Sequence, residues 1–508
     1  MRKYIILSAL SVLAGSVVAQ TEYDALRFSQ TYIQGSARSA AMGGAFGALG
    51  GDASVLAINP AGIGVYNVPD FGLTLDFAAN DTKITPASGN NEASKYALKI
   101  SNLSFMIPHD NGNSSGLTGW TFGVAYNRLA DFSIKENYNY INNAHSMLDS
   151  WCDNAYGLPE NTVKDFNGGL GFNAGLGYET YLLDHTKDGV NEYCNPHMNS
   201  WSGLEGAYGE RQRRNLETKG GINTWDFAVA TSFNHKLFLG ASLGIQTVNY
   251  KATSTYSEDD EQDAVPYEYW DFVEKNEVNG TGANFKIGLL AKPFSWFNFG
   301  ISAHTPTFYT IHDKYYTKVR AQYDAGTFDD GVDYYDAIST DNSYDYRLTT
   351  PFKYVLSAAI IAPSFTILSF DYEHLDYSKC ELNDEEFNDY DFYAQNEACK
   401  EKFQGVNNMR VGIEQCVQNL SFRAGYQLHG NPYKFMSGDK QRQIISAGFG
   451  IKHRNSSDNI IYLDVTGTYH IYQTDGFIYE SSDAQHSQRV SFDNRYLNIM
   501  LTLGIRFN

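Results

Sequence analysis

The last stretch of the chain alternates apolar and polar side chains without a break. Polar or small residues separate its apolar positions, which are Leu497, Ile499, Leu501, Leu503, Ile505 and Phe507. Alternation with a period of two predicts a β-strand with two different faces. A long one-sided strand at the end of a chain is typical of an outer-membrane barrel, where one face meets lipid and the other a polar lumen. The alternative is an edge strand of a large soluble β-sandwich.

Similar runs occur along the whole chain and give fourteen candidate strands. Each has about ten residues or slightly more, the length that a tilted barrel strand needs to cross a bilayer. They lie at residues 70–78, 96–107, 119–128, 224–234, 236–250, 283–292, 296–308, 352–361, 365–377, 406–415, 419–428, 441–453, 459–472 and 495–508.

The connections between these strands alternate in length. Odd-numbered strands are followed by long segments, and even-numbered strands by short ones such as Asn234-His235. Long external loops and short periplasmic turns are typical of bacterial outer-membrane barrels. Residues 70–508 are therefore predicted to form an all-β, transmembrane antiparallel β-barrel of about 14 strands with both termini in the periplasm. Its main extracellular loops are expected at residues 129–223, 251–282, 309–351 and 378–405.

The N-terminus predicts export. Arg2 and Lys3 precede an apolar run, and Val18-Ala19 ends it like a cleavage site. Residues 1–19 are therefore interpreted as a signal peptide. The run is too short for a membrane helix, and no comparable run follows it. This again favours a barrel as the membrane-spanning structure.

Composition and charge agree with this interpretation. The chain has 37 tyrosines and 31 phenylalanines, as aromatic girdles at both bilayer interfaces require. Its net charge of −20 argues against nucleic acid as a partner. H-E-x-x-H is absent and the histidines show no clustered triad spacing, so an enzyme is not expected.

The five cysteines fit an oxidising compartment. The predicted disulfides are Cys152–Cys194 and Cys380–Cys399, and Cys416 is left over. The alternative is a set of unpaired buried thiols. No C-x-x-C occurs, which argues against a zinc or thioredoxin-type site.

Two of the expected loops are acidic and aromatic, at residues 257–277 and 381–393. One interpretation is a contact with lipopolysaccharide bridged by divalent cations, or a calcium site. The favoured one is a solvated, variable surface, because neither stretch has the EF-hand ligand pattern. No metal and no cofactor is therefore predicted. Residues 129–223 are too many for a structureless loop and are expected to pack over or into the barrel mouth.

Residues 20–69 do not alternate and are rich in small side chains, above all between Gly35 and Gly64. Small residues let one backbone approach another closely. A barrel of this strand number has a lumen that needs filling. The segment is therefore predicted to lie inside the barrel as a plug.

The chain resembles the FadL/TodX family of outer-membrane transporters for long-chain fatty acids and other hydrophobic compounds. The resemblance spans nearly the whole mature chain and includes the predicted strand number. The motifs that carry it are A-M-G-G-A-F at residues 41–46, D-A-S at 52–54, N-P-A-G at 59–62, His304-Thr305-Pro306-Thr307, Thr350-Pro351, Arg423-Ala424-Gly425-Tyr426 and Asn431-Pro432-Tyr433.

The resemblance implies a hatch inside the barrel and passive uptake of a hydrophobic ligand. The ligand is caught outside, the hatch moves, and the ligand leaves sideways beside a kinked third strand. Asn59, Pro60, Ala61 and Gly62 become the hatch motif. Asn59 is expected to bond backbone groups that the kink leaves unpaired. Pro60 makes the turn rigid, and Ala61 has to be small.

Further residues are assigned on the same resemblance. Gly119 or Gly123 is expected to permit the kink in the third strand. No basic residue clearly marks a contact with a ligand's polar group, and Arg38 and Arg128 are the candidates. The chain is long for the family, with the excess in its loops.

Other functions stay open at this stage. A barrel of this kind can instead serve as a docking shuttle for secreted proteins, with the long loops as the binding surface. Haem capture is a variant of ligand uptake, with the candidate ligands His304, His312, His429 and His470, although lone histidines near barrel rims are more often surface residues. The expected partners are a hydrophobic small molecule, membrane lipid and lipopolysaccharide, and the protein is expected to be a monomer.

Overall fold

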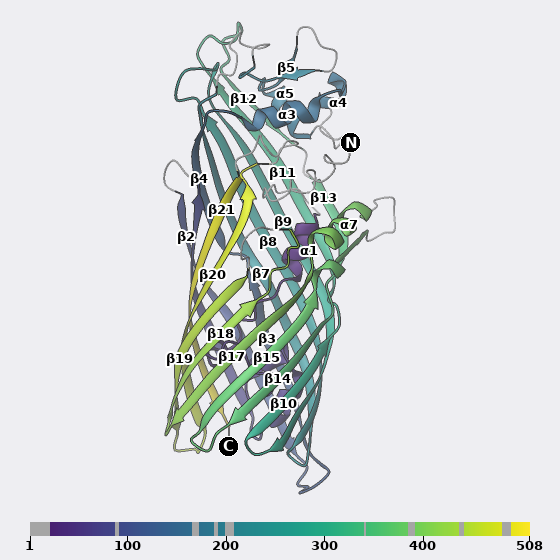
Figure 1. The fold of residues 1–508 in the computed structure, drawn as a ribbon, viewed down its shortest axis with the longest axis vertical. Helices are drawn as coiled ribbons and strands as arrows, with labels where there is room; N and C mark the ends of the chain where they lie inside the picture. Colours follow the sequence, from purple (N-terminus) through teal and green to yellow (C-terminus); the bar gives the residue numbers. More distant parts are fainter. Residues whose placement is uncertain are drawn as a thin grey trace.

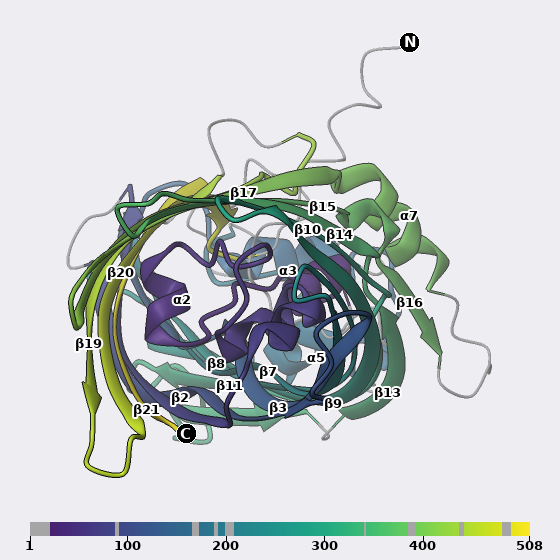
Figure 2. The ribbon, with the colours of Figure 1, turned by 90° about the horizontal axis from the view of Figure 1, so that it is seen from below.

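The chain forms a tall closed barrel with a segment threaded through its lumen (Figure 1, Figure 2). The computed structural model describes residues 21–86, 91–164, 172–186, 192–198, 208–339, 342–384, 392–435, 441–479 and 489–507. The predicted signal peptide, residues 1–19, lies outside these ranges.

The first and last strands close the barrel. β1 (Asp70–Thr85) pairs antiparallel with β21 (Arg489–Arg506) along its full length, up to Thr85 opposite Ser491. The other wall strands pair antiparallel with their neighbours, and four of them consist of two consecutive segments. Counted in this way the wall has fourteen strands, and the predicted barrel is confirmed.

All fourteen predicted runs fall on these wall strands. In chain order the strands are β1, β2 (Glu92–Asp110), β3 (Leu117–Asp131) with β4 (Ile134–Asn142), β7 (Glu210–Phe233), β8 (Leu237–Asp259), β9 (Tyr267–Phe294), β10 (Phe297–His304) with β11 (Phe308–Tyr323), β13 (Asn342–Thr349) with β14 (Lys353–Ile361), β15 (Thr366–Asp376) with β16 (Glu381–Asp384), β17 (Gly405–Val417), β18 (Leu420–His429), β19 (Arg442–Arg454), β20 (Ile460–Phe477) and β21. Outside this set, β12 (Tyr334–Ile338) pairs with β11, and β5 (Asp184–His185) pairs with β6 (Tyr193–Cys194).

The helices are short and lie within, above and beside the barrel. Those of the N-terminal segment are α1 (Glu22–Ser29), α2 (Ala37–Ala41) and the 3-10 helices η2 (Ala53–Ala57) and η3 (Pro60–Val65). Above the mouth are α3 (Met147–Ala155), α4 (Glu160–Lys164) and α5 (Phe172–Glu179), and beside it are η4 (Tyr377–Lys379) and α7 (Tyr393–Lys402). None of the helices in the described ranges has the length and hydropathy to cross a membrane.

An apolar belt surrounds the wall. In β7 the outward Trp225, Phe227 and Val229 are 41–48% exposed, whereas Asp226 and Ala228 between them are at most 3% exposed. A closed wall satisfies its backbone hydrogen bonds internally, which allows an apolar outer surface to meet lipid. The barrel therefore spans a membrane at the level of this belt.

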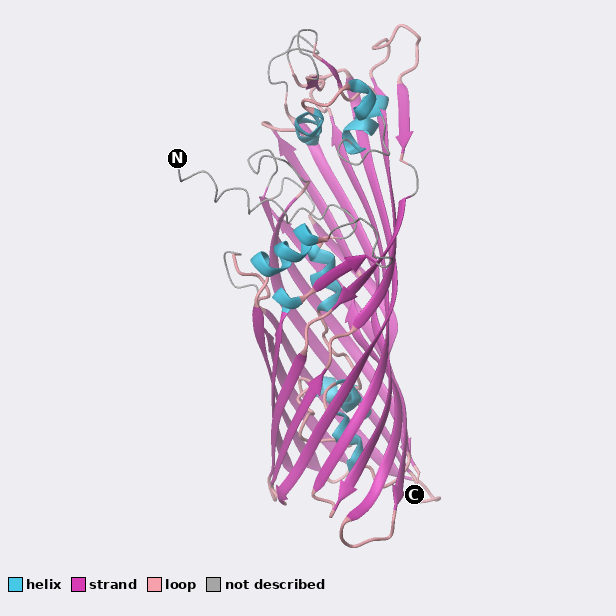
Figure 3. Cartoon of the chain, turned by 90° about the vertical axis from the view of Figure 1, so that its right-hand side faces the viewer, coloured by secondary structure: helices cyan, strands magenta, loops and turns pink. Residues whose placement is uncertain are grey.

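Above the belt the strands continue well into water. β8 and β9 stay paired up to Asp259 opposite Tyr269, so the expected loop at residues 251–282 is mostly a hairpin. Much of 309–351 is strand as well, and 129–223 contains β4 and the start of β7. The prediction of long loops in these regions was wrong in that respect (Figure 3).

The reason for this error is the outer face of the extended strands. Above the belt that face carries cross-strand ion pairs, such as Lys251–Glu277 at 3.0 Å and Arg213–Asp259 at 2.6 Å. The apolar alternation that marks a membrane strand therefore stops, although the backbone ladder continues. Hydrophobic periodicity detects where a strand meets lipid and does not detect where it ends.

The helices above the mouth form a cap, by which we mean α3, α4, α5, the β5–β6 hairpin and residues 195–198. Its aromatic core is shared with the tall side of the wall: the Trp151 ring lies 5.3 Å from the Trp270 ring and 5.3 Å from the Phe272 ring. The Tyr323 hydroxyl donates to the Thr180 carbonyl at 2.8 Å. The cap, which is one part of residues 129–223, thus packs over the mouth.

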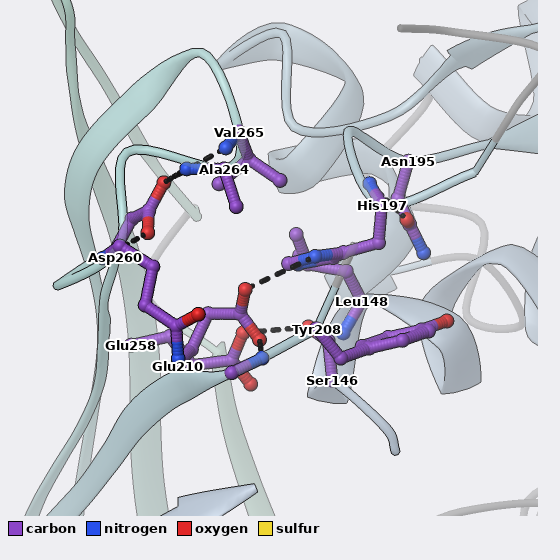
Figure 4. A network of polar contacts seen from close by, with 12 residues as sticks. Ser146, Leu148, Asn195, His197, Tyr208, Glu210, Glu258, Asp260, Ala264 and Val265 are labelled. Carbon is purple, nitrogen blue, oxygen red and sulfur yellow. Dashed lines mark hydrogen bonds and ion pairs between the residues drawn. The ribbon is translucent and has the colours of Figure 1, made fainter. Parts of the chain in front are cut away.

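Buried polar groups attach the cap to β7 and β8 (Figure 4). Glu258 accepts hydrogen bonds from the Ser146 hydroxyl at 2.6 Å and from the Met147 amide, the first of α3, at 2.9 Å. His197 Nδ1 lies 3.4 Å from Glu210 Oε1. Glu258, Glu210 and His197 are all fully buried. Burial raises the pKa of Glu210 from 4.5 to about 7; the nearby His197 acts in the opposite direction.

The two predicted disulfides are absent from the structure, where all five cysteines are free thiols. The Cys380 thiol instead donates to the Ser29 hydroxyl at 3.3 Å, and the Cys194 thiol to the Asp184 carbonyl at 3.5 Å. Burial raises the pKa of Cys380 and of Cys399, which favours the protonated, unreactive form. The alternative of unpaired buried thiols describes this arrangement, with Cys416 partly exposed.

The buried Glu210 predicts a pH dependence of the cap. Its pKa is raised in the folded cap, so the protonated form is favoured there and the cap loses stability as pH rises from about 4.5 to about 7. The loss is at most about 3 kcal/mol. Amides of α3, corrected for intrinsic rates, should exchange with solvent faster at pH 8 than at pH 5. Glu210→Gln should flatten this dependence, whereas Glu277→Gln on the exposed face of β9 should leave it intact; a flat profile in the unmodified protein would contradict the assignment.

Candidate functional site

The N-terminal segment runs the length of the lumen (Figure 2, Figure 3). At one end, Lys402 Nζ of α7 donates to Glu22 Oε1 of α1 at 2.6 Å. At the other end the segment joins β1, where Asp70 accepts a hydrogen bond from Arg506 at 2.7 Å. Both ends of the mature chain were predicted to lie on the side of the short turns. β21 does end there, whereas α1 lies at the opposite end of the lumen.

Polar side chains of the wall hold the backbone of this segment. The Ala37 amide donates a hydrogen bond to Thr502 Oγ1 at 2.8 Å, and the Ala37 carbonyl accepts one from Thr466 Oγ1 at 2.6 Å. The wall also donates to the carbonyls of Ala41, Ala45, Ala48, Leu56 and Ile58. A buried backbone without regular secondary structure needs such partners, so the segment is specifically docked.

Asn59 joins three parts of this region. Its Nδ2 donates to the Gly47 carbonyl at 2.7 Å and to the Leu289 carbonyl of β9 at 3.0 Å, and its Oδ1 accepts from the Ala61 amide at 3.2 Å. Asn59 is 1% exposed and precedes η3, in which Pro60 is the first residue. A proline is well placed there, because the first turn leaves its backbone nitrogen without a partner.

Glycines of the wall form a socket for this turn. A Cβ on Gly288 would overlap Asn59 Oδ1, one on Gly240 would overlap the Ala61 amide, and one on Gly300 would overlap the Gly47 carbonyl. The three glycines lie on the adjacent strands β8, β9 and β10. The motif therefore contacts the sixth wall strand and its neighbours, and Asn59 has no hydrogen bond to β3 among the described residues. This differs from the expected bond to a kinked third strand.

The wall is incomplete between β2 and β3. Their pairing ends at Asn102 opposite Asn127, and residues 92–101 of β2 pair only with β1 among the described strands. A bulge lies on each side of this point, at Ser101 in β2 and at Leu129 in β3. We call this part of the wall the seam.

The N-terminal segment closes the seam from inside. The Tyr32 amide donates to the Leu129 carbonyl, and the Gln34 amide donates to the Arg128 carbonyl at 3.2 Å. From the other side, Ser101 Oγ donates to the Gly35 carbonyl at 3.0 Å. Residues 32–35 thus satisfy backbone groups that the missing ladder leaves unpaired, which lipid would not satisfy.

Lysines bridge the seam above this point. Lys95 Nζ donates to Glu217 Oε1 at 2.9 Å and to the Thr218 carbonyl at 2.8 Å, and Lys99 forms an ion pair with Asp131. Outside, Leu98 is 71% exposed, compared with 44% for Phe105 in the paired part of the same strand. The seam therefore presents an unusually open apolar surface to the membrane.

The kink candidates lie below the seam. Gly123 sits in regular pairing opposite Met106 and Ala228. Gly119 is beside a bulge at the other end of β3, where a Cβ would crowd the His109 carbonyl. The irregularity closest to the seam is the bulge at Leu129, which no glycine marks in the sequence.

Both candidate arginines form hydrogen bonds with other groups of the protein. Arg38 Nε donates to Glu414 Oε2 at 3.0 Å, within a network that includes Arg423. Arg128 Nη2 donates to the Gly220 carbonyl at 2.8 Å, with Asp131 at 3.6 Å. Arg38 thus joins the N-terminal segment to the wall, and Arg128 joins β3 to β7.

A pocket lies between the N-terminal segment and the wall, with cations that the sequence analysis missed. Lys286 projects from β9 and pairs with Asp226, and Lys353 at the start of β14 lies 3.6 Å from Glu373. Both occupy inward positions of strands with apolar outer faces, and an inward lysine in such a strand was the available signal. The pocket is lined by Phe28, Ser29, Thr31, Ile33, Ala57, Leu129, Gln246, Asn284, Lys286, His304, Thr305, Thr307, Tyr309, Thr350, Pro351, Lys353 and Leu375.

The four candidate histidines engage separate partners. His304 Nε2 lies 2.8 Å from the Ile58 carbonyl, and His312 pairs with Asp345. His429 bonds Gln427, and His470 lies between Thr468 and Arg442. The described ranges contain no group of three or more His, Cys, Asp or Glu side chains placed to hold a metal ion.

Comparison with known proteins identifies the fold. Neither a protein-family model nor a curated protein matches the chain. A Pseudomonas aeruginosa FadL homologue superposes with a TM-score of 0.52 at 14% identity, over 94% of this chain and 98% of that chain. The P. putida toluene transporter TodX superposes with a TM-score of 0.51 at 12% identity, over 92% of this chain and 98% of that chain. This chain has the FadL/TodX fold. The resemblance read from the motifs is thus confirmed for the fold.

The socket predicts a substitution that displaces the segment of this FadL-type barrel. Gly288→Ala should push Asn59 out of place at a cost of about 1–3 kcal/mol, typical of overpacking. Amides of residues 53–66 should then exchange with solvent faster, while heat-modifiable gel migration shows an intact barrel. Gly467→Ala in β20 is the matched control, because a Cβ there has no neighbour within 4 Å. Equal exchange in the two variants would contradict a tight socket.

Proposed function

We propose that the protein is an outer-membrane channel for passive uptake of hydrophobic molecules such as long-chain fatty acids. The observation that carries the proposal is the seam between β2 and β3, which the docked N-terminal segment closes from inside. The FadL homologue and the toluene transporter TodX share the fold, which makes transport the expected activity. No covalent chemistry is involved.

The seam suits a lateral exit into the membrane. Leaving through the lumen would expose an apolar ligand to buried charges such as Arg410, Glu373 and Asp464. Leaving through the seam brings it directly to lipid beside Tyr96 and Leu98. Transfer from water to lipid supplies about 0.8 kcal/mol per methylene, which is enough to drive passive uptake.

The N-terminal segment acts as the hatch in this mechanism. Residues 32–35 lie in the seam, and Leu129 at the seam also lines the pocket. Withdrawal of this short stretch would join the pocket to the membrane without opening the wall ladder elsewhere. Asn59 and its socket hold the rest of the segment and so set how easily the stretch moves.

The proposal predicts faster uptake when the hatch is weakened. Asn59→Ala removes hydrogen bonds to the Gly47 and Leu289 carbonyls, and should raise uptake of a labelled fatty acid into proteoliposomes by about threefold or more. Deletion of residues 21–64 should raise it further. Asn279→Ala on the exposed face of β9 is the control and should not change the rate.

Two results would remove the proposal. Unchanged uptake in a folded barrel that lacks residues 21–64 would show that the segment gates nothing. Native mass spectrometry of the protein extracted from its own membrane should show an apolar adduct. A stoichiometric secreted protein in place of such an adduct would support the docking-shuttle function instead.

A further inference from the structure

A second break in the wall lies away from the seam, in the strand formed by β10 and β11. β10 ends at His304 and β11 begins at Phe308, so the regular ladder is interrupted at Thr305, Pro306 and Thr307, although the Thr305 amide still donates to the Phe285 carbonyl at 2.9 Å. Proline has no N–H to donate and cannot continue a central strand. The wall on one side of this break is intact, because β9 runs without interruption from Tyr267 to Phe294.

The neighbouring strand breaks at the same height. β13 ends at Thr349 and β14 begins at Lys353. The ladder pairs that flank the gap are His304 with Lys353 and Phe308 with Thr349. Three residues of each strand, 305–307 and 350–352, therefore face one another where the regular ladder is interrupted, with one backbone hydrogen bond between them, from the Thr350 amide to the Thr307 carbonyl. We call this region the window.

Threonine side chains replace part of the missing ladder. The Thr307 amide donates to Thr350 Oγ1 at 2.8 Å, and the Thr350 amide donates to the Thr307 carbonyl at 3.1 Å. Toward β9, the Phe285 amide donates to Thr305 Oγ1 at 3.0 Å. The Thr307 and Phe285 amides thus rely on hydroxyl acceptors, which can rotate. Among the described residues a single backbone hydrogen bond joins the two broken strands across the window, which makes the window weaker than a continuous ladder.

The pocket lies directly behind the window. Thr305, Thr307, Thr350 and Pro351 all line it, and Leu129 at the seam lines it as well. Ile33 lines the same pocket and lies between Tyr32 and Gln34, whose amides bond β3 at the seam. Its side chain also packs against two apolar clusters of the interior. The pocket therefore has lining residues at the window and at the seam, with the apolar Phe28, Ile33 and Ala57 among them.

Lipid lies directly outside the window. Phe308 is 60% exposed and Phe352 is 50% exposed, one on each broken strand. Phe285 on β9 is 45% exposed beside them. Further along β11, away from the window, the outer face of the wall is polar and carries the ion pair of His312 and Asp345. The window is thus at the upper edge of the apolar belt, where aromatic side chains line the membrane interface.

We propose that the window is a second lateral port, through which apolar molecules pass between the outer leaflet and the pocket. It rests on the proposed transport function and adds a route to it. A membrane-dissolved molecule would reach the pocket between Phe308 and Phe352, without first entering water. Opening needs only the Thr307–Thr350 contacts to part, because the two strands remain paired above and below the window.

Photolabelling tests the port directly. The mature protein is reconstituted in liposomes with an apolar, diazirine-bearing fatty-acid probe, and the labelled peptides are mapped by mass spectrometry. Labels are expected at residues 305–308 and 349–353, in addition to the seam at residues 95–101. Labels at the seam alone, with probe taken up normally, would overturn the second port and leave the proposed transport standing.

A conservative substitution tests the gate. Thr350→Val keeps the shape of the side chain and removes the acceptor of the Thr307 amide, so it should raise labelling in the window about fivefold. Thr310→Val on the exposed face of β11 is the matched control and should leave labelling unchanged. Equal labelling in the two variants would overturn the gate formed by Thr350.

A closed window provides the converse test. A disulfide between Thr307→Cys and Thr350→Cys should lower labelling of the window and the rate of probe uptake, and reductant should restore both. Undiminished labelling of residues 305–308 in the oxidised form would contradict the port. If the unmodified protein takes up no apolar probe and its pocket is never labelled, transport itself fails, and the port fails with it.

Discussion

The structure depends on one constraint, which is that every backbone N–H and C=O in the membrane must have a partner. Lipid offers none, and a closed antiparallel ladder is the standard solution for strands. Where the ladder of this barrel is interrupted, other groups take over its bonds. At the seam they are backbone groups of residues 32–35, and at the window the hydroxyls of Thr305 and Thr350 supplement the backbone hydrogen bonds that remain. The two openings that we propose are therefore the places where the wall is held least by its own strands.

The same constraint shapes the lumen. The N-terminal segment has little regular secondary structure, so its carbonyls need donors, and the wall supplies them from inward serine, threonine and asparagine side chains. Close approach is possible because glycines such as Gly240 and Gly288 face the segment. Many individually modest bonds fix the segment as a whole. Release of a short stretch of it costs far less than release of all of it.

The sequence predicted the wall better than the site, for a physical reason. Contact with lipid imposes an apolar outer face, and this alternation locates all fourteen strands. Above the belt the outer face is ionic, so pairs such as Lys251–Glu277 conceal strands that continue into water. The cysteine pairs were inferred because each pair lies within one long irregular segment, and this does not show that Cys380 bonds Ser29 instead. The partners of Arg38 and Asn59 depend on which wall strands face the segment, and local sequence does not contain that information.

The two breaks in the wall have unequal sequence signals, and this difference bears on their roles. The sequence signal for the window is two Thr-Pro pairs, at residues 305–306 and 350–351. Proline has no N–H and therefore cannot donate a ladder hydrogen bond. The seam has no such residue: β2 and β3 separate at two bulges, Ser101 and Leu129, whose side chains are ordinary for strands. A break encoded by proline persists whatever the N-terminal segment does, whereas the seam depends on that segment for its closure. In the proposed mechanism the seam is therefore the opening that hatch movement would control, and the window is the opening that the wall itself would control.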